Sequence, residues 1–312
     1  MRTPGRLFIL AVLAAATGLA CSAVAADADG RASAPRQTLI HDGIERSYVL
    51  RVPAGAAGGN ARVALVVVLH GGGGNADNAE QMTGFTDKSR SEGFIVVYPE
   101  GSGRRKDRLL TWNAGHCCGY AMERRIDDVG FIGALVDRLI AAYPIDPALV
   151  YATGMSNGAM MAHRLGIERS GKFAAIAPVV GTLFGDEKKP PHPVSALMIN
   201  GLLDKSVPDR GGPPGGRFTG AWDGTPTRPA LDQAAFWAEV DGCSGVPAKD
   251  APAAFTRWQY QCPANRAVEL YLVNDNGHAW PGGHRGSWMG DRPASSPDAT
   301  DVIWNFFKAH PK

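Results

Sequence analysis

The chain has 312 residues, of which 45% are hydrophobic and 20% charged, and its formal net charge is +2. A chain of this length and composition can bury the core of one large α/β domain or two small ones. A charge this close to zero gives the surface no electrostatic reason to favour nucleic acid or an anionic membrane, so neither is expected as a partner.

The first residues have the pattern of an export signal. Arg2 and Arg6 precede an apolar stretch at 7–20, and the small residues at 23–26 suit a cleavage site. The apolar stretch is too short for a comfortable membrane span, and no later segment is long and apolar enough to be one. We therefore expect residues 1–26 to be a signal peptide and residues 27–312 to form a single domain.

Loss of this leader would remove Arg2 and Arg6 and no acid, which brings the net charge of the mature chain to about zero. We expect a secreted protein, extracellular or periplasmic, without stable membrane insertion. Lipoprotein anchoring through Cys21 is the less favoured alternative, because Leu19 stands one position closer to the cysteine than a good lipobox places it.

Strand-like and helix-like segments alternate along the rest of the chain. Strands are expected at 46–52, 62–69, 94–98, 149–153, 173–180, 194–199 and 268–273. Helices are expected at 78–92, 127–143, 159–167 and 298–309. This alternation predicts a mainly parallel sheet covered by helices on both faces. Residues 184–193 and 209–229 are expected to be loops over the carboxyl edge of the sheet.

The segment Gly154-Met155-Ser156-Asn157-Gly158 lies between an expected strand and an expected helix. A G-x-S-x-G in that position is the nucleophile elbow of the α/β-hydrolases. The serine needs a sharp, strained turn, and the glycines let the strand and helix backbones approach closely enough to expose its hydroxyl. The pentapeptide alone fits an ordinary strand–helix turn equally well. Its interpretation as a nucleophile elbow therefore depends on finding a base and an acid elsewhere in the sequence.

A serine hydroxyl needs a base and an orienting acid, which follow it in the order Asp/Glu, then His, in this fold. Asp204 comes just after the strand at 194–199, and His278 lies in a glycine-flanked loop after the strand at 268–273. Both would project from the carboxyl edge, where α/β sheets build their sites. Asp209 and Asp275 compete for the role of the acid. The rival histidines are His70, His116, His163, His192 and His284.

A run of four glycines follows His70 at the end of the strand at 62–69. Such a loop supplies a backbone N–H to an oxyanion hole, together with the N–H of the residue after the nucleophile. We expect Gly72 and Asn157 to be these donors, with Gly71 or Gly73 as alternatives to Gly72. A phosphate-binding loop is disfavoured because no Gly-Lys-Ser/Thr follows the run.

Four cysteines remain after the expected cleavage, and an even number in an exported chain predicts disulfides. Cys243 and Cys262 would close one loop, contributing about 3 kcal/mol by the loop-entropy estimate. Cys117 and Cys118 would form a vicinal bond, or pair across to the other two cysteines. Zinc is disfavoured because no second cluster has ligand spacing. We therefore expect no metal and no cofactor.

Taken together, these motifs resemble the secreted poly(3-hydroxybutyrate) depolymerase and feruloyl esterase family over residues 40–310. The segments that carry the resemblance are 70–74 (HGGGG), 111–119 (TWNAGHCCG), 127–129 (DDV), 154–158 (GMSNG), 201–204 (GLLD) and 277–281 (GHAWP). The resemblance implies an α/β-hydrolase fold and a carboxylic-ester hydrolase with Ser156, Asp204 and His278 as its triad. It also places the loop with Cys117 and Cys118 near the active site.

The expected substrates are small or oligomeric esters. Depolymerases that degrade solid polyester usually carry a separate polymer-binding domain, so we expect short-chain or oligomeric hydroxyalkanoate esters, with feruloyl esters as the alternative. A serine peptidase and a non-catalytic secreted binding protein are less favoured, and a monomer is expected. Trp112 and Trp280 lie in motifs around the site and are expected to contact substrate, with core packing as the alternative.

Overall fold

The computed structural model describes residues 35–57, 61–106, 108–216 and 219–312. The expected signal peptide at 1–26, with Cys21, lies outside these residues. Among the described helices, none is long and apolar enough to cross a membrane.

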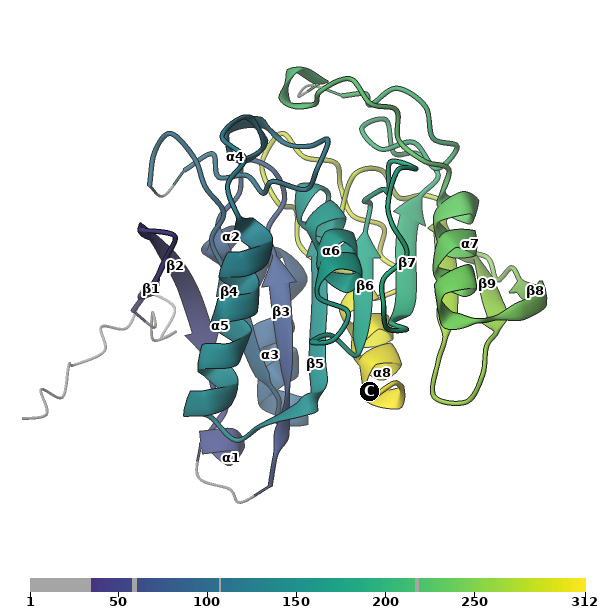
Figure 1. The fold of residues 1–312 in the computed structure, drawn as a ribbon. Helices are drawn as coiled ribbons and strands as arrows, with labels where there is room; N and C mark the ends of the chain where they lie inside the picture. The colour runs from purple at the N-terminus through teal and green to yellow at the C-terminus, as the bar shows by residue number, and fades with distance from the viewer. Residues whose placement is uncertain (1–34, 58–60, 107, 217–218) are drawn as a thin grey trace, which may run out of the picture. The chain divides into compact units, whose positions relative to one another are not determined.

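A ten-stranded sheet forms the centre of the domain, in the order β1-β2-β4-β3-β5-β6-β7-β10-β9-β8 (Figure 1). The strands are β1 Gln37–His41, β2 Ile44–Arg51, β3 Val63–Leu69, β4 Ile95–Pro99, β5 Ile145–Met155, β6 Ala175–Val179, β7 Ser195–Gly201, β8 Ser244–Asp250, β9 Phe255–Gln261 and β10 Val268–Val273. Neighbours from β4 through β10 pair in parallel, whereas β1, β2, β8 and β9 pair antiparallel at the two edges. The prediction of a mainly parallel sheet is confirmed.

Helices cover both faces of this sheet, as predicted. One face carries α5 Asp128–Ala142, α6 Asn157–Glu168 and α7 Ala230–Asp241, and the other carries α2 Ala76–Thr83, α3 Phe85–Glu92 and α8 Ala299–Ala309 (Figure 1). Three short helices complete the described set: α1 Ala54–Ala57, α4 Gly119–Glu123 and the 3₁₀ helix η1 Thr219–Ala221.

The central strands are apolar throughout because both of their faces are buried. Along β3, the side chains of Leu65 and Val67 join the core under α5, α6 and α7, while Val66 and Val68 join the core under α2, α3 and α8. All four are fully buried. This explains the continuous β-branched run in the sequence, where a half-exposed strand would alternate with polar residues.

Several predicted elements differ from the observed ones. The single helix predicted at 78–92 is wrong: it is two helices, α2 and α3, separated by Gly84 in the left-handed conformation (φ 67°). The amide of Gly84 closes α2 by donating to Glu80 O. Helix α7 and the strands β1, β8 and β9 were not predicted.

The parallel strands deliver their carboxyl ends to one edge of the sheet, at the top of Figure 1, where long loops gather. Strand β3 ends at Leu69, β5 at Met155, β7 at Gly201 and β10 at Val273. Each of these ends is followed within a few residues by one of the predicted site residues. The sheet topology therefore brings together segments that are distant in sequence.

Candidate active site

Ser156 stands at the junction of β5 and α6 with φ 57° and ψ −121°, a strained conformation for a residue with a side chain. Its amide donates to Val179 O at 3.0 Å, which ties the turn to β6. A Cβ atom on Gly154 would lie 2.7 Å from Leu69 O, and one on Gly158 would lie 2.5 Å from His70 O. Both glycines are therefore required by the close approach of β5 and α6 to the end of β3.

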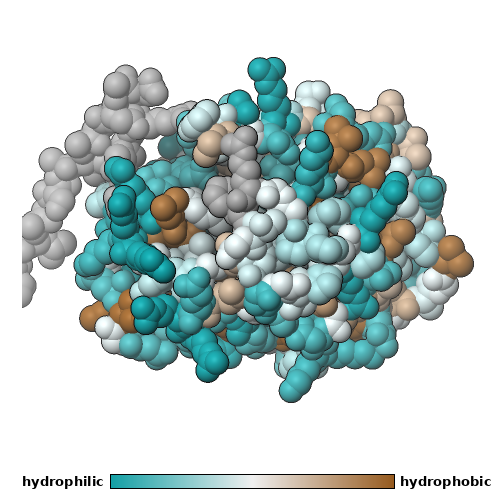
Figure 2. All heavy atoms as spheres, turned by 90° about the horizontal axis from the view of Figure 1, so that it is seen from above, coloured by the Kyte–Doolittle hydropathy of each residue, from teal (hydrophilic) through white to brown (hydrophobic). Residues whose placement is uncertain are grey.

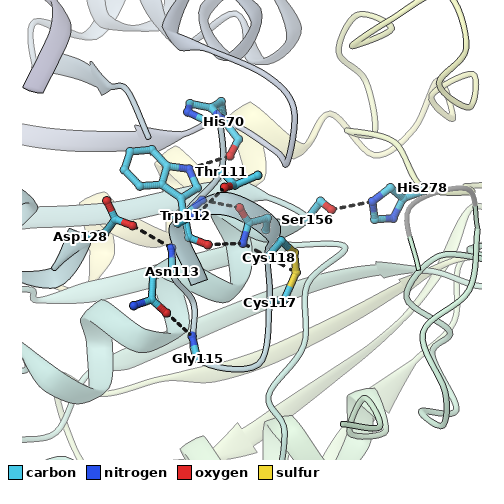
Figure 3. The surroundings of a disulfide bond; sticks show 12 residues. His70, Thr111, Trp112, Asn113, Gly115, Cys117, Cys118, Asp128, Ser156 and His278 are labelled. Atoms are coloured by element: carbon cyan, nitrogen blue, oxygen red, sulfur yellow. Dashed lines mark hydrogen bonds between the residues drawn. A yellow bond between two sulfur atoms is a disulfide. The ribbon is translucent and has the colours of Figure 1, made fainter. Parts of the chain in front are cut away.

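Three side chains meet at this turn. Ser156 Oγ lies 2.8 Å from His278 Nε2, and His278 Nδ1 lies 2.7 Å from Asp204 Oδ2. Figure 3 shows the Ser156 hydroxyl directed toward the His278 ring. A carboxylate only accepts, so it fixes the tautomer with the proton on Nδ1 and leaves Nε2 to accept from the serine. This arrangement can deprotonate the serine during attack on a carbonyl carbon.

The Asp204 carboxylate is held from both sides. Its Oδ1 accepts from the backbone amides of Ser206 at 2.7 Å and Val207 at 2.9 Å, which leaves Oδ2 for His278. The Asp204 side chain is fully buried, whereas the His278 side chain remains 20% exposed. Asp204 is therefore shielded from water, whereas the His278 ring is still accessible from the surface.

The loop that carries His278 is fixed by two residues that the sequence motifs did not single out. The buried Asn276 side chain donates to Gly277 O and Ala279 O, each at 2.9 Å. Asp291 Oδ2 accepts from the His278 amide at 2.7 Å. Asn276 lies beside the GHAWP segment and could have been suspected from that position, but Asp291 has no sequence signal.

The glycine loop offers amides near the nucleophile. Gly73 N donates to Leu110 O at 2.7 Å and Gly74 N donates to Gly71 O at 3.0 Å, so these two amides are already engaged. A Cβ on Gly72 would lie 3.6 Å from Asn157 Cβ, which places this glycine beside the residue after the nucleophile. Asn157 is the first residue of α6, and amides in the first turn of a helix have no acceptor within that helix.

His70 shapes this loop and does not face the nucleophile. Its Nδ1 lies 2.8 Å from Gly71 O and its Nε2 accepts from Gly101 N at 3.0 Å. Burial lowers the pKa of His70 to about 4, so the ring is neutral at ordinary pH. A neutral ring, which has one donor and one acceptor nitrogen, fits both contacts. These contacts connect the loop at Gly71 to the chain at Gly101.

The residue after the nucleophile holds the neighbouring loop. Asn157 Oδ1 accepts from Trp112 N at 2.7 Å, and Asn157 Nδ2 donates to Trp112 O at 3.0 Å. The same Nδ2 lies 3.8 Å from Cys117 Sγ. The TWNAGHCCG segment is therefore attached directly to the nucleophile elbow.

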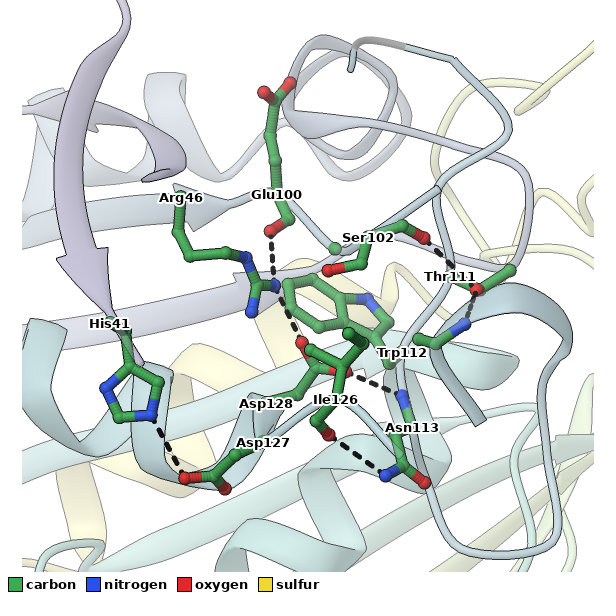
Figure 4. A network of polar contacts seen from close by, with 12 residues as sticks. His41, Arg46, Glu100, Ser102, Thr111, Trp112, Asn113, Ile126, Asp127 and Asp128 are labelled. Carbon is green, nitrogen blue, oxygen red and sulfur yellow. Dashed lines mark hydrogen bonds and ion pairs between the residues drawn. The ribbon is translucent and has the colours of Figure 1, made fainter. Parts of the chain in front are cut away.

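A buried ion pair between Arg46 and Asp128 holds the TWNAGHCCG segment at Asn113 (Figure 4). Arg46 on β2 contacts Asp128 Oδ1 at 2.7 Å and also donates to Glu100 O at 3.0 Å. The second oxygen, Asp128 Oδ2, accepts from Asn113 N at 2.7 Å. The neighbouring Asp127 caps α5 through Gly130 N at 2.8 Å. The DDV segment thus has a structural explanation, as a support for the loop at Asn113.

Both tryptophans expected to contact substrate are fully buried. Trp112 Nε1 donates to His70 O at 2.9 Å, and Trp280 Nε1 donates to Thr300 Oγ1 at 3.0 Å. Trp280 also packs against Phe85, with ring centroids 6.2 Å apart. With no exposed surface and both indole N–H groups satisfied internally, the expectation of substrate contact is replaced by the packing alternative.

We expect Trp112→Ala to lower the free energy of unfolding by about 3–5 kcal/mol, the usual cost of removing a large buried aromatic side chain. Activity on aryl and short aliphatic esters should fall together. The substitution would disturb His70 and the glycine loop that follows it, which are needed for both kinds of ester. Thermal unfolding and paired kcat/KM values measure both effects. Trp288→Ala is the control, because Trp288 is 81% exposed. A change in selectivity with unaltered stability would restore the substrate-contact role of Trp112.

Cys243 and Cys262 form a disulfide, whereas the vicinal Cys117–Cys118 bond stays a prediction. The disulfide joins the end of α7 to the end of β9, with an S–S distance of 1.99 Å. Among the described residues, the cluster with spacing for a metal ion is His41, Asp42 and Asp127. There His41 Nε2 already lies 3.0 Å from Asp127 Oδ2, and both aspartates are exposed.

Known proteins are similar to this chain over most of its length. A family model described as "Esterase PHB depolymerase" matches residues 46–205. A putative esterase, NocK, of Nocardia uniformis is 31% identical over 87% of this chain and 83% of its own length. Feruloyl esterase B of Piromyces equi is 27% identical over 77% of this chain, which spans 44% of that enzyme.

A likeness in fold is also found among solved structures. An acetyl xylan esterase from Aspergillus awamori superposes with a TM-score of 0.59 at 14% identity, over 88% of this chain and all of that one. At that identity the likeness shows the α/β-hydrolase fold alone.

Proposed function

The chain belongs to the PHB depolymerase esterase family and is a carboxylic-ester hydrolase, and we propose that Ser156, His278 and Asp204 carry its reaction. The observation that supports this assignment best is the continuous hydrogen-bonded path from Ser156 Oγ through the His278 ring to the buried Asp204 carboxylate. Asp209 and Asp275 compete with Asp204 for the role of the acid in the sequence. In the part of the chain that the structure describes, the carboxylate that contacts the His278 ring is that of Asp204.

Ser156 Oγ attacks the ester carbonyl carbon while His278 Nε2 takes the hydroxyl proton. The resulting imidazolium is stabilised by Asp204 and then gives its proton to the leaving alcohol. Water enters, loses a proton to His278 and attacks the acyl carbon, which releases the acid and restores the serine.

Gly72 and Asn157 amides are the proposed donors to the oxyanion. Asn157 N belongs to the first turn of α6, where the helix dipole also favours negative charge. Gly71 and Gly73 are the alternatives to Gly72 as the second donor. The amide of Gly73 already donates to Leu110 O, so Gly71 is the stronger of these two alternatives.

We propose short-chain or oligomeric hydroxyalkanoate esters as substrates, with feruloyl esters as the second candidate. The family match supports the first, and the names of relatives such as feruloyl esterase B support the second. Seen from above, the described surface carries its hydrophobic residues in separate patches among hydrophilic ones (Figure 2). A soluble ester suits such a face better than a solid polymer, which would need a continuous apolar patch.

Export is part of this proposal. The Cys243–Cys262 bond fits an oxidising compartment, and the leader pattern at 1–26 fits secretion.

A small panel of esters tests the substrate proposal. Purified protein is assayed on p-nitrophenyl acetate and butyrate, a soluble 3-hydroxybutyrate oligomer and methyl ferulate, with a peptide anilide as control. We expect turnover of the p-nitrophenyl esters and the oligomer, and none of the anilide. Higher kcat/KM for methyl ferulate than for the oligomer would shift the assignment to the second candidate, and hydrolysis of the anilide alone would contradict both.

A further inference from the structure

His116 joins three loops at the carboxyl edge of the sheet. Its Nδ1 lies 2.7 Å from Asp223 Oδ2 and its Nε2 lies 3.0 Å from Asp186 Oδ2. Asp186 follows β6 and Asp223 follows η1, whereas His116 belongs to the loop that Asn157 attaches to the nucleophile elbow. The hydroxyl of Thr225 also lies 3.0 Å from Nδ1.

Asp186 and Asp223 can both accept from the His116 ring only when the ring is protonated. Neutral imidazole has one N–H donor, whereas imidazolium has two, and a carboxylate can only accept. Asp186 and Asp223 are the charged groups that face the ring. Despite partial burial, which acts in the opposite direction, these two carboxylates raise the pKa of His116.

The same loops carry two aromatic side chains that are only half-buried. Phe184 packs edge-on against His116, with ring centroids 5.0 Å apart, and Trp222 packs edge-on against Phe184 at 6.1 Å. The backbone of Trp222 pairs with that of Cys117, whose sulfur contacts the Asn157 side chain. Phe184 therefore contacts Trp222, which is connected through Cys117 to Asn157, the residue next to Ser156.

We propose that His116 is a positioning residue whose imidazolium clamps the loops of Asp186 and Asp223 together, and so holds Phe184 and Trp222 as one wall of the substrate site. The proposal rests on the proposed esterase site for its effect on substrates. When His116 contacts both aspartates, Phe184 and Trp222 restrict the entry of bulky acyl or alcohol groups. When these contacts are lost, the two aromatic side chains can move and admit such groups.

The direction of the pH dependence follows from the raised pKa. The clamp is complete when His116 is protonated, and it is lost as the pH rises through the pKa of the folded protein. The groups are partly exposed, since the His116 side chain is 28% and Asp186 69% accessible, so the contacts are screened by salt.

A titration that does not depend on activity tests the clamp itself. The imidazole resonances of His116, assigned with His116→Gln, are followed by NMR from pH 5 to 9. We expect a midpoint above the ordinary value of about 6.5, and a lower midpoint in Asp223→Asn and in high salt. A midpoint at or below the ordinary value that Asp223→Asn leaves unchanged would overturn the clamp, whatever the enzyme hydrolyses.

Kinetics test its consequence. The KM ratio of a bulky aromatic ester to p-nitrophenyl acetate is measured between pH 5.5 and 8.5. We expect the ratio to change by about two- to tenfold in the wild type, as suits partly exposed ion pairs, and to be nearly flat in His116→Gln. His192→Gln, at an exposed histidine of the Asp186 loop, is the control and should keep the wild-type profile.

Coincident profiles of the wild type and His116→Gln would overturn the positioning role. Failure to hydrolyse any ester would count against the proposed function and leave the NMR result to decide the clamp.

Discussion

Ser156→Ala is expected to lower kcat by about 10⁴- to 10⁶-fold on every accepted ester, because no other hydroxyl occupies the turn at the end of β5. The Ser156 side chain lies 2.8 Å from His278 Nε2, and its backbone conformation exposes it at the carboxyl edge. The change removes one oxygen atom and leaves the turn geometry to the backbone, so the melting temperature should not fall. Single-turnover and steady-state rates on p-nitrophenyl butyrate measure the effect.

The double variant sharpens this test. His278→Ala should cost about as much as Ser156→Ala, and the combination should be little worse than either, because the two residues act as a unit. Ser91→Ala is the matched control at an exposed serine and should keep full activity. A Ser156→Ala protein that retained a tenth of the wild-type kcat would remove Ser156 from the proposed mechanism.

The sequence could predict the candidate site because each part follows the end of a parallel strand. The spacing of Ser156, Asp204 and His278 placed all three at one edge, and strand pairing alone brings that edge together. Most of the predicted strands are buried on both faces, where a continuous apolar run is required. The predicted strand at 46–52 is the partly exposed β2, whose apolar and polar residues alternate. Edge strands such as β8, with mostly exposed residues, lack that signal.

Burial of individual aromatic residues could not be predicted in this way. Trp112 and Trp280 stand in motifs around the site, yet both are core residues, while the half-buried Phe184 and Trp222 come from segments with no motif. Which side of a loop faces the core depends on partners far along the chain, such as His70 O for Trp112. The division at Gly84 was missed for a similar reason, because a glycine inside a helical pattern does not by itself predict a break.

The role of His116 shows the same limit. In the sequence it stands beside two cysteines and raises the question of zinc. In the structure its ring faces Asp186 and Asp223, which are 70 and 107 positions away. Neither acid follows a recognisable motif, so only the arrangement of loops at the carboxyl edge reveals the contact.

Asp204→Asn is expected to lower kcat by about 10³- to 10⁴-fold while leaving the fold intact. The amides of Ser206 and Val207 both donate to Oδ1 and would select the oxygen of an asparagine for that position. The amide nitrogen of the new side chain would then face His278 Nδ1, which lies 2.7 Å from Oδ2 in the wild type. Because that nitrogen only donates, His278 would have to accept at Nδ1 and carry its proton on Nε2.

In that tautomer His278 cannot take the proton of Ser156, so the base is present but wrongly protonated. The pH–rate profile distinguishes this from a simple loss of packing, since activity should recover in part at high pH, where the serine hydroxyl needs less help. Asp275→Asn is the matched control, at an exposed acid close to His278 in the sequence, and should leave kcat unchanged. Equal losses in the two variants would mean that Asp204 does not orient the base, because only Asp204 has the two backbone donors that force the asparagine to present its nitrogen.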